Sequence, residues 1–225
     1  MFCDIAAILR LPDKLNMKKI LLIDDHDVVR KGLILLLQDF YPGATILEAG
    51  NGEESTELLK KHEVDLVILD IQIPGTNSFE LLNFIVNFYP LVKILVFSMG
   101  SENLYGKRFL MAGAHGYLSK EASMAEIRKA IETIMNGKKY LTEKLIDVVL
   151  QDFSGKHNIN PFEKLSAREF EILTFLLRGY TIAEISIQVH LQPSTVGTYK
   201  SRIFEKLQVS NIIELKELAS LYNTV

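Results

Sequence analysis

Four short apolar segments, each followed by a polar or charged residue, constrain the fold more than any other feature of the chain. Segments of this kind are typical of strands in a parallel sheet that is buried on both faces. Ligands of such sheets bind beyond the carboxyl ends of the strands, so the following residues are expected to meet on one surface. The segments and their following residues are 20–23 with Asp24 and Asp25, 66–69 with Asp70, 94–97 with Ser98, and 116–119 with Lys120.

Three carboxylates, a hydroxyl and an ammonium group on one surface favour phosphoryl-transfer chemistry. Clustered carboxylates repel one another and recruit a hard divalent cation, and Mg²⁺ takes a few carboxylate oxygens while keeping several waters. A carboxylate can also act as a nucleophile and accept a phosphoryl group. Mg²⁺ and a lysine ammonium would neutralise charge on that group, and a hydroxyl would hydrogen-bond one of its oxygens.

Helical segments alternate with the apolar segments. Together they make five strand–helix pairs in roughly 120 residues, which predicts one open, doubly wound α/β sheet. The last helix is expected to end at Asn136-Gly137. The strand and helical patterns that complete the sheet are a strand at 45–49 and helices between 28 and 37, at 53–62, between 79 and 85, at 104–111 and between 124 and 134.

Size and charge limit the remaining possibilities. The chain has 225 residues, enough for two modest domains, and its net charge of −3 means that any nucleic-acid contact has to come from a local basic patch. Cys3 is the only cysteine, which excludes an internal disulfide framework, and the histidines show no metal-ligand spacing. No apolar run approaches the roughly 20 residues of a membrane span. We therefore expect a cytoplasmic protein without a membrane partner.

Two segments lie outside the regular patterns. Residues 1–16 are a poor secretory signal, and Met17 precedes the first strand as a natural start would. We expect 1–16 to be an N-terminal extension, with a short packed helix as the alternative. Residues 138–162 are expected to form a linker, because a predicted helix at 140–150 is followed by a polar stretch without apolar periodicity.

From residue 163 onward only helical patterns remain. Ser166 and Glu169 have the spacing of a capping box, which starts a helix. A second, short helix is predicted at 181–188, and Pro193 suits the first position of a third. Two helices joined by a turn, the last of them basic on one side, predict an all-α helix-turn-helix domain that binds DNA.

Residues 17–137 resemble the receiver domain of a two-component response regulator, which has a flavodoxin-like doubly wound (βα)5 fold. The resemblance is carried by the motifs ILLIDDH, DLVILDIQIPG, ILVFSMG and GYLSKEA. It implies that Asp70 is phosphorylated by a sensor histidine kinase or a phosphotransfer protein. The other implied site residues are the Mg²⁺ ligands Asp25, Asp70, the carbonyl of Gln72 and, through water, Asp24, and the switch residues Ser98, Tyr117 and Lys120.

Residues 163–222, in a domain assigned to 163–225, resemble the LuxR-type helix-turn-helix of the NarL/FixJ family. The matching motifs are LSAREFEIL, GYTIAEI and PSTVGTYKSRIFEKLQV, and the last is most similar to EvgA/BvgA-type regulators. Several residues depart from the family pattern. Gln192 is a poor helix cap, Gly197 weakens a helix interior, and Ile182 and Ala183 replace the usual Asn-Lys pair. The resemblance implies phosphate contacts by Thr195, Lys200 and Lys206 and major-groove contacts by Gly197, Thr198, Ser201 and Arg202.

The two resemblances together predict a phosphorylation-dependent, DNA-binding transcriptional regulator and not an enzyme. Phosphorylation of Asp70 would draw in Ser98 and Lys120, turn Tyr117 inward and release a recognition helix that the receiver masks. A homodimer would then bind paired half-sites of double-stranded promoter DNA. The apolar stripe between Ile212 and Leu221 would pack mostly on its own domain and leave one edge for the dimer.

Two other functions are compatible with the same residues. One is a Mg²⁺-dependent phosphohydrolase that passes through an aspartyl phosphate, but Gln72 stands where such enzymes often carry a second acid to activate water. The other is an interaction module or phosphate sink with a vestigial output domain, which the weakened recognition helix keeps open.

Overall fold

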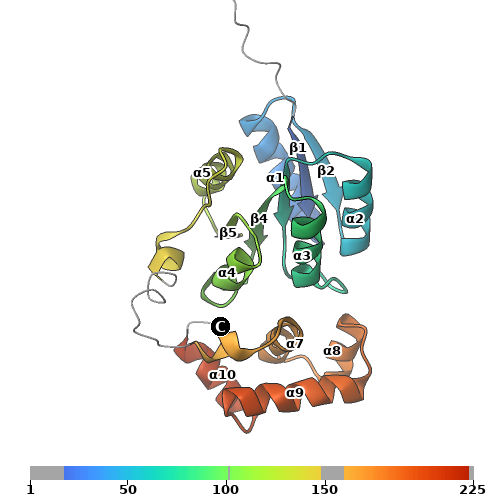
Figure 1. The fold of residues 1–225 in the computed structure, drawn as a ribbon, viewed down its shortest axis with the longest axis vertical. Coiled ribbons are helices and arrows are strands. Elements are labelled where there is room, and N and C mark those ends of the chain that lie inside the picture. The colour runs from blue at the N-terminus through green and yellow to red at the C-terminus, as the bar shows by residue number, and fades with distance from the viewer. Residues whose placement is uncertain (1–17, 101, 148–159, 223–225) are drawn as a thin grey trace, which may run out of the picture.

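The computed structural model describes residues 18–100, 102–147 and 160–222. Five strands alternate with five helices in the N-terminal part, and the C-terminal part is helical (Figure 1). In chain order the elements are β1 (Lys19–Ile23), α1 (Asp27–Phe40), β2 (Thr45–Ala49), α2 (Gly52–Lys61), β3 (Leu66–Leu69), α3 (Ser78–Phe88), β4 (Lys93–Ser98), α4 (Glu102–Met111), β5 (Gly116–Ser119), α5 (Met124–Met135), η2 (Pro161–Lys164), α7 (Ala167–Leu177), α8 (Ile182–Gln188), α9 (Pro193–Leu207) and α10 (Ile212–Leu221).

The five strands form one parallel sheet in the order β2-β1-β3-β4-β5. Its three central strands are buried almost throughout, and their residues divide between two apolar clusters, one on each face of the sheet. This burial explains why these strands read as continuous apolar runs without polar alternation. The predicted doubly wound α/β fold is therefore confirmed.

The strand order places the functional residues. Chain connections leave β1 and β3 in opposite directions along the sheet, and the carboxyl ends of such neighbouring strands form a crevice. Ile23 pairs with Leu69 at the ends of β1 and β3, so Asp24 and Asp70 follow side by side. Ser98 ends β4 on the same edge.

Capping explains where the helices of the C-terminal part begin. Ser166 and Thr181 each form a capping box with the glutamate three residues later, and these caps start α7 and α8. Gly179, in the left-handed conformation, ends α7. Gln192 provides no side-chain cap for α9, as predicted, and Pro193 occupies the first turn instead.

The predicted helix at 140–150 begins later than expected. Residues 143–147 are helical and start from Thr142, whose hydroxyl accepts a hydrogen bond from the Leu145 N–H over 3.2 Å. Tyr140 instead lies beside Gly116 in a parallel bridge that extends the sheet, and it is buried. This bridge to a distant strand, which local periodicity cannot reveal, overrides the helical pattern. The extension 1–16 and residues 148–159 of the predicted linker lie outside the described residues.

The receiver-like part contacts the C-terminal helices through α4 and the loop before α3 (Figure 1). The opposing elements are α7 and η2, whereas α9 lies on the far side of its domain. Masking of α9 by the receiver is therefore not observed in this arrangement, because the apolar face of α7 packs on the receiver.

Among the described residues, no helix combines the length and apolar character needed to cross a membrane.

Candidate functional site

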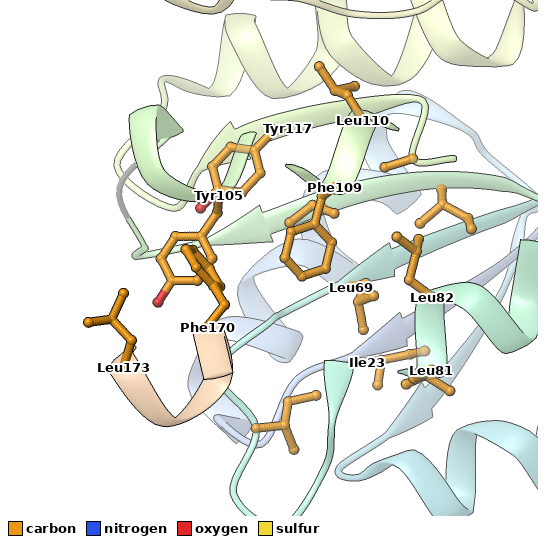
Figure 2. Close-up of a cluster of buried hydrophobic side chains, with 14 of the residues drawn as sticks. Ile23, Leu69, Leu81, Leu82, Tyr105, Phe109, Leu110, Tyr117, Phe170 and Leu173 are labelled. Atoms are coloured by element: carbon orange, nitrogen blue, oxygen red, sulfur yellow. The ribbon is translucent and has the colours of Figure 1, made fainter. Parts of the chain in front are cut away.

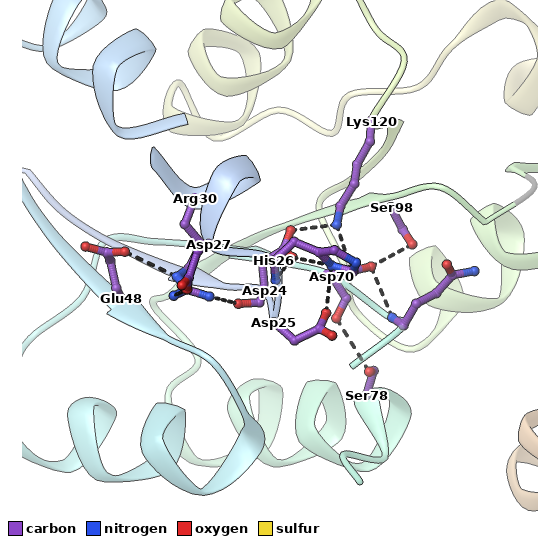
Figure 3. A network of polar contacts seen from close by, with 11 residues as sticks. Asp24, Asp25, His26, Asp27, Arg30, Glu48, Asp70, Ser78, Ser98 and Lys120 are labelled. Atoms are coloured by element: carbon purple, nitrogen blue, oxygen red, sulfur yellow. Dashed lines mark hydrogen bonds and ion pairs between the residues drawn. The ribbon is translucent and has the colours of Figure 1, made fainter. Parts of the chain in front are cut away.

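Three aspartates from the ends of β1 and β3 meet at one edge of the sheet (Figure 3). One ligand atom from each of Asp24, Asp25, Asp70 and the adjacent His26 lies within 4.8 Å of the others. Asp24 and Asp70 are only 3% and 2% exposed, whereas the side chain of Asp25 is 28% exposed. A compact set of carboxylate oxygens, open on one side, fits a hard divalent cation such as Mg²⁺.

Lys120 connects the two buried carboxylates. Its Nζ lies 2.6 Å from Asp24 Oδ2 and 2.8 Å from Asp70 Oδ2. Burial alone would lower the pKa of Lys120, but hydrogen bonds and charge from the two aspartates outweigh it and raise the pKa. Lys120 is therefore cationic at neutral pH and placed to offset negative charge beside Asp70.

The second oxygen of Asp70 is held by hydrogen bonds. Ser98 Oγ donates to Asp70 Oδ1 over 2.7 Å, and the backbone N–H of Gln72 donates to the same oxygen over 3.0 Å. The sequence-based role of Gln72 was that of a carbonyl ligand to Mg²⁺, and this role stays a prediction. With Oδ2 bonded to Lys120, the Asp70 carboxylate is fixed in one orientation.

Tyr117 already points inward. Its side chain is fully buried, and its hydroxyl donates to the carbonyl of Gly100 over 2.7 Å. Burial raises the pKa of Tyr117 well above its ordinary value, so the hydroxyl stays protonated. The inward rotation of Tyr117 that the sequence predicts on phosphorylation is not required here, because the side chain already lies inward.

His26 was not among the predicted site residues, although it belongs to the cluster. Its Nδ1 lies 2.9 Å from Asp25 Oδ1 and 3.2 Å from Asp24 Oδ1. The side chain is 62% exposed, so the ring can leave when a cation binds. The sequence feature that could have identified His26 is its position directly after Asp24 and Asp25, and not its spacing from other histidines.

The structure places the predicted DNA-contacting residues on α9. Thr195, Thr198, Ser201 and Arg202 are exposed, and nothing lies within 4 Å of where a side chain would begin at Gly197. The hydroxyls of Thr198 and Ser201 donate to carbonyls of the preceding helical turn. These side chains share one accessible surface and need no partner from the rest of the domain.

Two of the predicted phosphate-contacting lysines have partners within the domain. Lys200 lies over the ring of Phe204 at 5.3 Å, which leaves its ammonium group at the surface. Lys206 Nζ lies 2.7 Å from Glu169 Oε2. Glu169 is buried, which alone would raise its pKa, but the bonds from Lys206 and Ser166 lower it. A phosphate would have to compete with Glu169 for Lys206.

Two family models match the chain. Residues 20–132 match the response regulator receiver domain, and residues 163–219 match the LuxR family of bacterial regulatory proteins. The receiver model spans half of the chain, and the two models follow each other in the predicted order. The chain therefore belongs to the response regulators that carry a LuxR-type DNA-binding domain. These are transcription regulators and not enzymes, so the phosphohydrolase alternative is not supported.

Whole-length relatives agree with this assignment. The response regulator GacA of Pseudomonas syringae pv. syringae is 34% identical over 210 residues, which are 93% of this chain and 98% of GacA. The response regulator UvrY of Escherichia coli is 33% identical over 204 residues, which are 90% of this chain and 94% of UvrY. The similarity thus extends across both domains.

Solved structures of RcsB from Salmonella share the fold. One was determined with RcsB bound to the promoter rprA in the presence of the phosphomimetic BeF3⁻; it has a TM-score of 0.67 and 21% identity, and the match covers 90% of this chain and 98% of that one. Another RcsB structure has a TM-score of 0.72 at 21% identity, covering 93% and 100%. At this identity the likeness concerns the fold alone.

Proposed function

We propose that Asp70 is the phospho-acceptor of this regulator and that its phosphorylation controls DNA binding by α9. The observation that carries the proposal is the bonding of the Asp70 carboxylate, whose two oxygens are held by Lys120 on one side and by Ser98 and Gln72 on the other. The carboxylate attacks the phosphorus of a phosphodonor, an O–P bond forms, and the bond from phosphorus to the leaving group breaks.

The residues of the site have distinct parts in this reaction. Asp25 and Asp70, with Asp24 through water, would hold Mg²⁺, which neutralises charge on the transferred group when bound. Lys120 donates its ammonium hydrogens to a phosphoryl oxygen, and Ser98 donates its hydroxyl to another. Ser98 therefore gives up its bond to Asp70 when the phosphoryl group arrives.

The partners follow from the same chemistry. A sensor histidine kinase or a phosphotransfer protein would supply the phosphoryl group, and promoter DNA would bind the exposed face of α9. We propose that the phosphorylated protein binds as a homodimer, with the exposed Ile213 on α10 at the edge available for it, since Leu215 is buried in its own domain. These activities place the protein in the cytoplasm. We assign residues 17–137 to the receiver and 163–225 to the DNA-binding domain.

Intact-mass measurement tests the trigger. After incubation with acetyl phosphate and Mg²⁺, the wild-type chain should gain the mass of one phosphoryl group, and Asp70→Asn should not. Footprinting on the chain's own upstream region, with and without the phosphodonor, then tests control of DNA binding. An unaltered wild-type mass contradicts the assignment of Asp70, and identical footprints contradict control by phosphorylation.

A further inference from the structure

We propose that Gly100 and Tyr105 transmit the state of the Asp70 site to α7 of the DNA-binding domain, and that Gly100 has no side chain because one would push Tyr105 off Phe170. This inference rests on the proposed function and names the residues that would connect its two halves. It concerns contacts beyond Ser98 and Tyr117, the switch residues already implied by the family.

Gly100 is bonded to both switch residues. Its N–H donates to Ser98 Oγ over 3.3 Å, and its carbonyl accepts from the Tyr117 hydroxyl over 2.7 Å. Because Ser98 in turn donates to Asp70, only Ser98 separates Gly100 from the proposed phospho-acceptor. When Ser98 turns toward a phosphoryl oxygen, the Gly100 N–H loses its acceptor or moves with it.

The ring of Tyr105 packs directly on Gly100. A Cβ added at Gly100 would lie 2.9 Å from Tyr105 Cε2, 3.0 Å from its Cδ2 and 3.2 Å from the Tyr117 hydroxyl oxygen. Gly100 is not among the glycines with positive φ in the described ranges, so alanine fits its backbone. Alanine at this position would therefore act through contact with the two tyrosine rings and not through backbone strain.

The other side of Tyr105 contacts the DNA-binding domain (Figure 2). Its ring meets Phe170 of α7 edge to face, with centroids 5.3 Å apart and an interplanar angle of 83°. Arg108, one turn further along α4, lies over the same Phe170 ring at 4.2 Å and donates to the carbonyl of Leu165. Phe170 is therefore held between two side chains of α4, and movement of Tyr105 loosens its packing.

One buried hydrogen-bond donor at this contact between the domains lacks an acceptor among the described residues. Nη1 of Arg108 is buried and has no hydrogen-bond partner in the described part of the chain, and burial lowers the Arg108 pKa. A buried donor without a partner destabilises the arrangement that contains it. A cavity of about 350 Å³ also adjoins Tyr105, Phe170 and Arg108. We expect a displacement of Tyr105 from Gly100 to weaken this contact and shift the balance toward separated domains.

Gly100→Ala tests the inference without any phosphodonor. The variant should separate the domains without a phosphodonor, seen as a larger radius of gyration than that of wild type by solution X-ray scattering. Gly32→Ala on α1 is the matched control, because nothing lies within 4 Å of its Cβ position. A Gly100→Ala protein with the wild-type radius of gyration would overturn the proposal, whatever happens at Asp70.

Tyr105→Leu tests the same connection if Gly100→Ala proves unstable. Acetyl phosphate with Mg²⁺ should still add one phosphoryl group to this variant, but its radius of gyration should no longer change on phosphorylation. A change equal to that of wild type would overturn the proposal. A wild-type chain that gains no phosphoryl group would instead refute the Asp70 assignment, so the two failures are distinguishable.

A double-mutant cycle separates transmission from simple loosening. If Gly100 acts through Phe170, the effect of Gly100→Ala on the radius of gyration should largely disappear in a Phe170→Ala background. Additive effects of the two substitutions would show that Gly100 acts by another route and would contradict the inference.

Discussion

The acidic site and the exposed face of α9 both consist of polar and charged side chains, but those of the acidic site are largely buried and those of α9 are exposed. Asp24 and Asp70 are buried and joined through Lys120, and the buried Ser98 donates a hydrogen bond to Asp70. On α9, Thr198 and Arg202 are exposed, and the threonine hydroxyl is satisfied by its own helix. Phosphoryl transfer needs groups fixed in advance where water is scarce. DNA recognition needs side chains that are free to reach bases and phosphates. Substitutions should therefore affect reactivity and stability in the first region, and affinity alone in the second.

The largest effect is expected at Asp70. Asp70→Asn removes the nucleophilic oxygen while keeping the shape of the side chain, so phosphorylation by acetyl phosphate should be abolished. Intact-mass spectrometry measures this directly. Asp39→Asn, on the exposed surface of α1, is the control and should gain a phosphoryl group at the wild-type rate. Phosphorylation of Asp70→Asn would show that another residue is the acceptor.

Lys120→Met tests whether the buried site depends on its ion pairs. The substitution leaves Asp24 and Asp70 buried without their cation, and loss of one partner of a buried pair typically destabilises by about 3–5 kcal/mol. Urea unfolding at pH 7 measures the change, and added Mg²⁺ should restore part of it. Lys61→Met, which breaks an exposed i,i+4 pair with Glu57, should change stability by less than about 0.5 kcal/mol. Equal losses of unfolding free energy in Lys120→Met and Lys61→Met would refute the contrast between the buried and the exposed ion pairs.

Arg202→Ala tests the exposed region. If Arg202 reads base edges, its loss should weaken specific DNA binding by about 1–3 kcal/mol and relax sequence preference at one position. The melting temperature should not change, because the side chain is exposed. Fluorescence anisotropy with matched and mismatched duplexes measures affinity and preference. Lys216→Ala on α10 is the control. A large drop in melting temperature for Arg202→Ala would instead show that Arg202 stabilises the fold.

Glu169→Gln tests a buried residue that pairs with Lys206 of the exposed helix α9. Its lowered pKa means that its contribution to stability is present above the ordinary value of 4.5 and is lost as the pH falls through the folded-state pKa. Glutamine keeps the capping-box geometry, so the variant should lose about 1 kcal/mol at pH 7 and differ little from wild type in acid. Urea unfolding across pH 3–7 measures this. A difference that persists unchanged at low pH would contradict the ion-pair explanation.

Much of the acidic site was predictable because parallel strands impose a simple rule. Asp70 and Lys120 directly follow β3 and β5, Ser98 ends β4, and the carboxyl ends of these strands share one edge of the sheet. The capping boxes of α7 and α8 are equally local, since they depend on residues three positions apart. His26 was missed because its contribution comes from side-chain orientation toward the aspartates, which residue spacing does not report.

The sequence by itself determined the α/β receiver-like sheet, the helical second domain and the residues gathered at the strand ends, because these follow from apolar periodicity and short-range capping. Only the tertiary structure decided that Tyr140 joins the sheet, that Lys206 pairs with Glu169, and that Tyr105 and Arg108 enclose Phe170. The physical reason is that each of these contacts joins residues far apart in the chain. Their strength depends on how two surfaces fit, and a linear pattern does not encode that fit.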